Sequence, residues 1–232
     1  MDTPVHDPVV CLISSFREGE LIQGAIRSAI PCSEKIIVWE GSTNPKASPG
    51  MGEKTRLGDM ATAVSNFHVG AWGDEAKKRN AMLRLARDLM RKPFWILTLD
   101  ADEILVWSEY LGDWLNALRP GYPRSDQNVV PLKITVPGYD EETKHGPATY
   151  IQPSRLVHSS LVEEYTNGLV LAVTPDGAKL DFSAYRSELP PVVGEPHIHH
   201  RYYLRRPDRA RTRGYQLEQD ELQRSGIVEA KK

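Results

Sequence analysis

The sequence predicts an α/β fold: a mostly parallel sheet with flanking helices, followed by a β-rich half and a C-terminal helical segment. Two observations predict it. Over the first 120 residues, short apolar runs alternate with amphipathic stretches, which is the pattern of βαβ units. From there to about residue 205, hairpin turn signals separate short apolar runs. We therefore expect a single domain over residues 1–232.

The first three elements are predicted to form a βαβ unit. Val9–Ile13 is a short, β-branched apolar run, which indicates a buried strand. The apolar residues of Leu21–Ile30 repeat at helical spacing, and Pro31 ends that helix. Ile36–Trp39 is the next apolar run. Strand, helix and strand within about 30 residues predict two parallel strands joined by a helix.

The next elements continue the alternation. Thr62–Val69 is predicted to be a strand, and Asp74 is predicted to cap the helix that follows it. Phe94–Leu99 is a continuous apolar run and therefore a third buried strand. A further helix is predicted over Ser108–Leu118, with Ser108 as its N-cap.

The second half carries turn signals instead of helical stripes. Val129–Val136 is predicted to be a strand. Asn167-Gly168 separates two apolar runs, which is the strongest short signal for a hairpin, and Pro175–Gly177 is a second turn. Pro207–Gln223 is polar and predicted to be helical.

The composition excludes several classes of protein. The chain has 232 residues, of which 40% are hydrophobic and 26% charged, and its net charge is −2. Disordered, collagen-like and strongly basic proteins are excluded by these values. No stretch approaches the roughly 18 to 20 apolar residues of a membrane span, and the N-terminus shows no export pattern. Cys11 and Cys32 form no CxxC pair, so we expect reduced thiols and a cytoplasmic protein.

The residues with the clearest chemistry follow the third apolar strand. Asp100, Asp102 and Glu103 stand at its carboxyl end, which is where open α/β sheets bind ligands. In extended backbone Asp100 and Asp102 would point the same way and could share a divalent cation. A solvated acidic turn that caps the next helix is the alternative.

Five segments taken together resemble a family 2 glycosyltransferase of the GT-A fold, in its Asp-Ala-Asp-Glu form. Their order and spacing match the family over about half of the chain, and two departures stand out. Arg17-Glu18 replaces the usual Asn-Glu, and Trp39-Glu40 replaces the usual Asp-Asp or Asp-Ser. The matching segments are Val10–Glu18, Ser28–Ile30, Ile36–Thr43, Arg79–Leu83 and Trp95–Glu103.

The resemblance implies transfer of a sugar from a nucleotide diphosphate donor, with a UDP-sugar favoured, to a hydroxyl acceptor with inversion. It implies that residues 1–120 bind the nucleotide-sugar, that residues 121–205 face the acceptor, and that 206–232 form a helix or tail. It also implies Mn²⁺ or Mg²⁺, with Asp102 as direct ligand and Asp100 on the ribose or on the metal through water. The donor-binding residues that it implies are Ser14, Phe16, Arg17, Glu18, Glu40, Arg79, Asp100 and Ala101.

Two roles are left open between several residues. The base that deprotonates the acceptor is expected among Glu103, Asp140, Glu141, Glu163 and Glu164. A late histidine is implied to complete the metal or diphosphate site. Strand alternation puts His197 and His199 on one side and His200 on the other, and His199 is the expected ligand.

The acceptor and the class of protein also have alternatives. The acceptor could be a saccharide, a protein, a small molecule or a modified base in nucleic acid. The basic run from Arg201 to Arg213 suits phosphate, an anionic headgroup or nucleic acid, and equally a solvated helix face. A nucleotidyltransferase on a related fold and a non-catalytic carbohydrate- or nucleotide-binding module are the competing functions.

Overall fold

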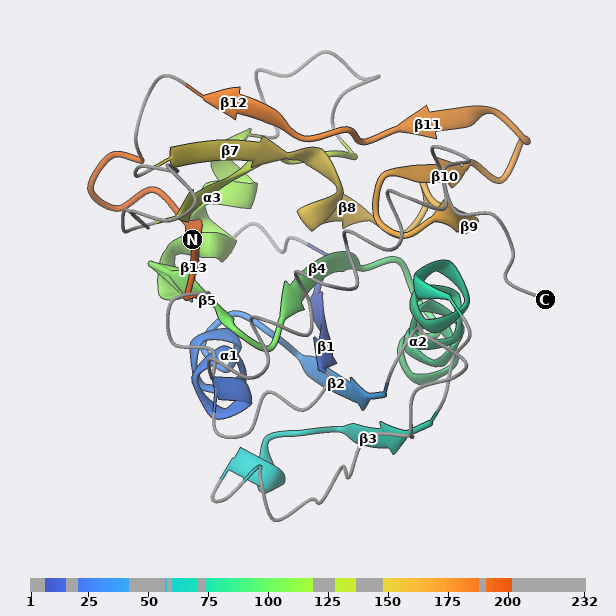
Figure 1. Cartoon of the computed structure of the whole chain (residues 1–232), viewed down its shortest axis with the longest axis horizontal. Helices are drawn as coiled ribbons and strands as arrows, with labels where there is room; N and C mark the ends of the chain where they lie inside the picture. The colour runs from blue at the N-terminus through green and yellow to red at the C-terminus, as the bar shows by residue number, and fades with distance from the viewer. Residues whose placement is uncertain are drawn as a thin grey trace, which may run out of the picture.

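The computed structural model describes residues 7–15, 21–41, 57, 60–70, 74–118, 128–136, 148–187 and 191–201. In these ranges the chain is mixed α/β with three sheets, which confirms the predicted class (Figure 1). Within the described ranges, no helix has the length and apolar character needed to span a bilayer. The predicted C-terminal helix lies outside the described residues.

The first sheet has five strands in the order β3-β2-β1-β4-β8. The pairs β1–β2, β1–β4 and β2–β3 are parallel, as the βαβ pattern predicts, and β8 runs antiparallel to β4. The carboxyl ends of β1, β2 and β4 therefore meet at one edge, which we call the strand-end edge. The strands are β1 (Val9–Ser15), β2 (Lys35–Glu40), β3 (Asn66–Val69), β4 (Trp95–Asp100) and β8 (Leu156–His158).

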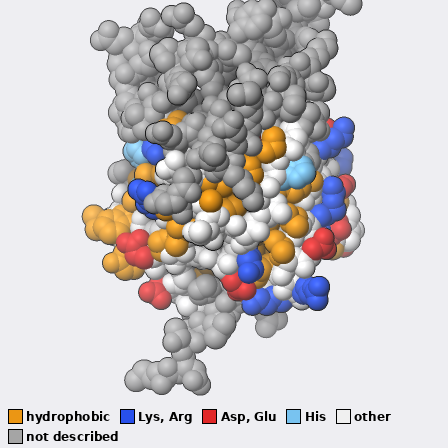
Figure 2. All heavy atoms as spheres, turned by 90° about the horizontal axis from the view of Figure 1, so that it is seen from below, with side chains coloured by type: hydrophobic (Ala, Val, Ile, Leu, Met, Phe, Trp, Pro, Cys, Tyr) orange, Lys and Arg blue, Asp and Glu red, His pale blue; other side chains and the backbone are white. Residues whose placement is uncertain are grey.

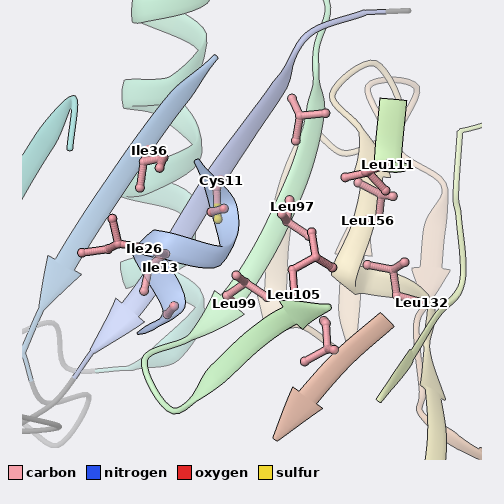
Figure 3. Close-up of a cluster of buried hydrophobic side chains, with 14 of the residues drawn as sticks. Cys11, Ile13, Ile26, Ile36, Leu97, Leu99, Leu105, Leu111, Leu132 and Leu156 are labelled. Carbon is pink, nitrogen blue, oxygen red and sulfur yellow. The ribbon is translucent and has the colours of Figure 1, made fainter. Parts of the chain in front are cut away.

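Two helices cover opposite faces of this sheet, α1 (Leu21–Ala29) and α2 (Glu75–Met90) (Figure 1). Alternate residues of each strand point to opposite faces, so each helix packs on its own set of side chains. Figure 3 shows the α1 side, where the buried cluster extends from Ile26 and Ile13 to Leu105, Leu132 and Leu156. The α2 side is built from another set, which includes Val10, Leu12, Ile37, Ile96, Met82, Leu83 and Ala86.

The helix α2 begins as the sequence predicts. Asp74 is its N-cap, and the Asp74 side chain accepts a hydrogen bond of 2.6 Å from the backbone N–H of Lys77. Arg91 adopts a left-handed conformation at the C-cap, two residues before Pro93.

The chain after β4 departs from the prediction at two points. Ala101 and Asp102 form a turn, so the backbone is not extended from Asp100 to Asp102. The strand β5 (Glu103–Val106) then leads through Trp107, whose φ is 60°, into a 3₁₀ turn and α3 (Leu111–Leu118). Ser108 is the first residue of that 3₁₀ turn and Trp107 is the N-cap, so the predicted role of Ser108 as N-cap is wrong.

The β-rich character of the second half is confirmed in the described residues. The second sheet has the order β12-β7-β6-β13-β5, so it joins late strands to β5 from the first half. Its later strands are β6 (Leu132–Val136), β7 (Ala148–Gln152), β12 (Tyr185–Ser187) and β13 (His197–His200). A 3₁₀ turn, η3 (Pro153–Arg155), connects β7 to β8.

The third sheet is the predicted hairpin region. It consists of β9 (Glu164–Asn167), β10 (Leu171–Val173) and β11 (Lys179–Asp181) in antiparallel order. Gly168 and Gly177 have φ values of 54° and 86°, which explains why glycine occupies both turns.

Two predicted strands are shorter than expected. The range Val129–Val136 is interrupted, because Pro131 has no N–H to donate to a ladder. Val129 makes an isolated bridge to Val157, and β6 begins only at Leu132. The range Thr62–Val69 is a strand only from Asn66 onward.

The thiols and the surface agree with the composition. Cys11 is a buried free thiol and Cys32 is a partly exposed one. Figure 2 shows acidic and basic side chains intermixed on the described part of the lower face, as a net charge of −2 leads one to expect.

Candidate functional site

The residues Asp100–Glu103, which we call the acidic turn, lie at the strand-end edge and are fixed by backbone hydrogen bonds. The Ala101 N–H donates to the Ser14 carbonyl at the end of β1 over 2.9 Å. The Asp102 carbonyl accepts from the Arg201 N–H over 2.8 Å, just after β13. The turn is therefore held by one strand from the first half and by the last described strand of the second.

Glu103 closes the acidic turn through its own side chain. Its Oε2 accepts a hydrogen bond of 2.7 Å from the Asp100 N–H, and its Oε1 accepts one of 2.8 Å from Arg155 Nη2. Burial raises the pKa of Glu103 to about 7, against the lowering effect of the Arg155 charge. Both carboxylate oxygens thus have donors inside the protein, which gives Glu103 a structural role in the turn instead of the predicted role of base.

Asp100 lies between two arginines. Arg79 Nη2 donates to one carboxylate oxygen over 2.9 Å, and Arg155 Nη2 donates to the other over 3.3 Å. The Asp100 side chain keeps 33% of its surface exposed, whereas both arginines are nearly buried. Arg79, one of the expected donor-binding residues, therefore lies at the acidic turn. With both oxygens engaged by guanidinium groups, Asp100 is poorly suited to bind a metal directly.

Arg155 is a site residue for which the sequence pattern predicted no role. It comes from η3, and its Nε donates to Gln152 Oε1 over 3.0 Å, which orients the guanidinium toward the acidic turn. A charged residue directly before the apolar pair Leu156-Val157 was the available signal.

Asp102 faces a histidine, but not the expected one. His200 Nε2 lies 3.1 Å from Asp102 Oδ2, and the Asp102 side chain is fully buried. His200 pairs with Glu103 in the β13–β5 ladder, which brings it to the acidic turn. The structure therefore brings back the histidine segment as predicted, and places His200 beside Asp102.

His199 and His197 make other contacts. His199 Nδ1 lies 3.2 Å from Thr135 Oγ1, and His197 Nδ1 lies 2.9 Å from the Glu195 carbonyl. Partial burial lowers the pKa of His199, and the neighbouring charges of His197, Arg201 and His200 lower it further. His199 is thus not brought next to Asp102, because successive strand residues point to opposite faces.

Few side chains among the described residues could serve as metal ligands at this edge. No group of three His, Cys, Asp or Glu side chains that could hold a metal occurs among them. Asp102 and His200 are close enough to be two ligands of one ion, and a carboxylate with an imidazole is a donor set suited to Mn²⁺. Within the described ranges, no third protein ligand accompanies this pair.

The predicted nucleotide-binding residues lie along the same edge where they are described. Ser14 is half-buried near the end of β1, and Glu40 is a buried carboxylate at the end of β2. Trp39 donates through Nε1 to Asn66 Oδ1 over 2.9 Å, and its ring centroid lies 4.8 Å from that of His68. Phe16, Arg17 and Glu18 lie outside the described residues.

Lys78 is a second residue that sequence reasoning missed. Its side chain is buried, and Nζ donates to the Ser15 carbonyl over 3.1 Å and to the Gly41 carbonyl over 3.3 Å. The available signal was helical spacing, because Lys78 and Arg79 lie one turn before the buried pair Met82-Leu83.

The two described base candidates that remain, Glu163 and Glu164, lie away from the acidic turn. Arg87 donates to the carbonyls of Val162 and Glu163 and forms an ion pair of 3.4 Å with the Glu163 carboxylate. Arg87 is about 12 Å along α2 from Arg79, at 1.5 Å per residue. Glu164 is exposed on β9 beside this contact, and Asp140 and Glu141 lie outside the described residues.

Comparison with known proteins adds no relative. No family model matches the chain, and no curated protein matches it. The strand-end edge is therefore the feature that points to function: an acidic turn bound by two arginines, the buried Asp102 carboxylate beside His200, and a buried lysine.

Proposed function

We propose that this chain is a metal-dependent glycosyltransferase of the GT-A type, which moves a sugar from a nucleotide diphosphate, with a UDP-sugar favoured, to a hydroxyl acceptor. The observation that carries the proposal is the pairing of the buried Asp102 carboxylate with His200 at the carboxyl end of β4. A buried carboxylate beside an imidazole at this edge suits a cation that a diphosphate would complete.

The topology of the first sheet supports this proposal. From β1 the sheet continues through β2 to β3 on one side and to β4 on the other. Ligands of open α/β sheets bind outside the strand ends where the order of strands changes direction. Ser14 and the acidic turn lie at that point.

Asp102 and His200 are the proposed ligands of Mn²⁺. When bound, the cation would stabilise the negative charge that develops on the diphosphate leaving group, an effect worth several kcal/mol. Asp102 contributes the charge, and His200 the nitrogen ligand that favours Mn²⁺ over Mg²⁺. Asp100, held by Arg79 and Arg155, is proposed to present its carboxylate to the ribose hydroxyls.

Glu40 is the proposed contact to the nucleoside. It stands at the end of β2, the position at which the family resemblance implies recognition of the base. The acceptor is a hydroxyl group of a saccharide, a protein, a small molecule or a modified nucleic acid, and inversion at the sugar carbon is expected.

A thermal-shift and hydrolysis panel tests the proposal. The protein is incubated with UDP-, GDP-, CMP- and dTDP-sugars, with and without Mn²⁺. At a hundredfold excess over Kd, one ligand with Mn²⁺ should stabilise the fold by about 2.7 kcal/mol. For a chain of this length the melting temperature should rise by roughly 5 to 10 °C.

Asp102→Asn is the matched control, since the amide keeps the shape and removes the charge. This variant should show neither the Mn²⁺-dependent shift nor turnover. Absence of a shift with every nucleotide and metal would contradict the proposal. A shift without hydrolysis or transfer to any acceptor would favour the non-catalytic binding module.

A further inference from the structure

We propose that Lys78 is a positioning residue of the strand-end edge. Its buried ammonium ties together the ends of β1 and β2, and thereby holds Ser14 and Glu40 in place for the nucleotide. The consequence for nucleotide binding rests on the proposed function, whereas the hold on the two strands does not.

Three hydrogen bonds meet where β1 and β2 end. The Ser15 carbonyl accepts from the Gly41 N–H over 2.9 Å and from Lys78 Nζ over 3.1 Å. Lys78 Nζ also donates to the Gly41 carbonyl over 3.3 Å. Lys78 thus bonds to the residues at which the chain leaves both strands.

The backbone at Gly41 has an unusual conformation. Its φ is 150°, a conformation open almost only to glycine, and its peptide is the last that pairs with β1. A single donor that bridges Ser15 and Gly41 fixes this conformation from outside the ladder.

The burial of Lys78 is costly, and its surroundings compensate in part. Only 1% of the residue is exposed, whereas the side chain of the adjacent Lys77 is 73% exposed. Burial lowers the pKa of Lys78 to about 8, and the Arg79 charge acts in the same direction. The charges that oppose this lowering belong to Glu75 on α2, Asp100 on β4 and Glu40 on β2.

Lys78 would affect nucleotide binding through Glu40, the proposed contact to the nucleoside. Lys78 is a cation whose charge acts on the buried Glu40 carboxylate, and it also bonds to the next residue along the chain. Loss of the ammonium would free Gly41 and remove a compensating charge from Glu40. Both changes would weaken a ligand bound at the end of β2.

Amide hydrogen exchange on the protein without ligand tests whether Lys78 holds the ends of β1 and β2 together. Lys78→Met removes the ammonium and keeps most of the side-chain volume, and Lys77→Met is the matched control. We expect the Gly41 amide to exchange at least about fivefold faster in Lys78→Met and unchanged in Lys77→Met. The Trp95 amide, which donates to the Pro8 carbonyl at the opposite end of the sheet, should not change.

The comparison of amides and variants distinguishes local opening at Gly41 from destabilisation of the whole fold. Equal acceleration of the Gly41 and Trp95 amides, or no acceleration of Gly41, would overturn the proposal. Lys78→Arg keeps a charged donor and should leave Gly41 exchange within about twofold of wild type. If Lys78→Met does not fold, Lys78→Gln, which lacks the charge, is measured in its place with the same expectation.

Nucleotide affinity tests the consequence. For whichever nucleoside diphosphate binds the wild type with Mn²⁺, Kd should rise at least about fivefold in Lys78→Met and stay unchanged in Lys77→Met. Faster Gly41 exchange with an unchanged Kd would overturn the positioning role. If no nucleotide binds the wild type, the proposed function fails, and the exchange measurement still decides whether Lys78 holds the strands.

Discussion

Arg155 is the residue whose removal should cost the fold most at the acidic turn. It donates from Nη2 to Glu103 over 2.8 Å and to Asp100 over 3.3 Å, and its side chain is 7% exposed. Arg155→Met keeps the apolar stem and leaves the Glu103 carboxylate buried without its cation. Removing one partner of a buried ion pair costs about 3 to 5 kcal/mol. The melting temperature should fall by roughly 6 to 20 °C at pH 8.

The loss of stability in Arg155→Met should be larger at pH 8 than at pH 5. Burial raises the pKa of Glu103 to about 7, and the Arg155 charge is the largest influence that lowers it. A carboxyl group with a raised pKa contributes stability that is full below its unfolded value and is lost as the pH rises through the folded value. Removing Arg155 raises the pKa further, so the variant loses more stability between pH 5 and pH 8. We expect the destabilisation at pH 5 to be smaller than at pH 8 by about 1 kcal/mol, because a rise of one pKa unit is worth about 1.4 kcal/mol and most of it falls within this pH range.

Urea unfolding at pH 5 and pH 8 measures both quantities, with Arg87→Met as the control. Arg87 also donates to backbone carbonyls and pairs with a carboxylate, but its side chain is 31% exposed and that of Glu163 is 57% exposed. Its removal should cost about 1 kcal/mol at either pH. Equal losses for Arg155→Met at both pH values, or a loss below about 1 kcal/mol, would refute the buried network.

Two further predictions concern the ligands of the proposed donor site. His200→Ala should raise the Mn²⁺ concentration needed for the nucleotide-dependent thermal shift by at least about tenfold, whereas His199→Ala should leave that titration unchanged; the reverse result would restore His199 as the ligand. Glu40→Ala should weaken nucleotide binding by about 1.5 to 3 kcal/mol while turnover at saturation changes little, and an unchanged Kd in calorimetry would remove Glu40 from the nucleotide site.

Local sequence patterns were sufficient for the elements that build the strand-end edge. The apolar runs of β1, β2 and β4 are continuous because both faces of the sheet are covered, and this made them recognisable. Asp74 and Asn167-Gly168 act through bonds and backbone angles within a few residues, so their roles could also be predicted.

The features that could not be predicted from the sequence depend on the pairing of strands that are far apart in the chain. Alternation predicted that His197 and His199 share a face, but the face that meets the acidic turn depends on the register of β13 against β5. A slip of one residue would exchange the two faces. The relative orientation of Asp100 and Asp102 could not be predicted either. The Glu103 side chain accepts a hydrogen bond from the Asp100 N–H, and a turn replaces the extended backbone that alternation assumes.

The acidic turn explains why the two halves belong together. The first half supplies Asp100, Asp102 and Glu103 but only one described guanidinium, from Arg79, that bonds to them. Arg155 arrives from η3, and His200 arrives from β13. Each of the three acids therefore has a partner from the second half, and without those partners the buried carboxylates would repel each other. We infer that the site forms only when β8 and β13 have added to the sheets.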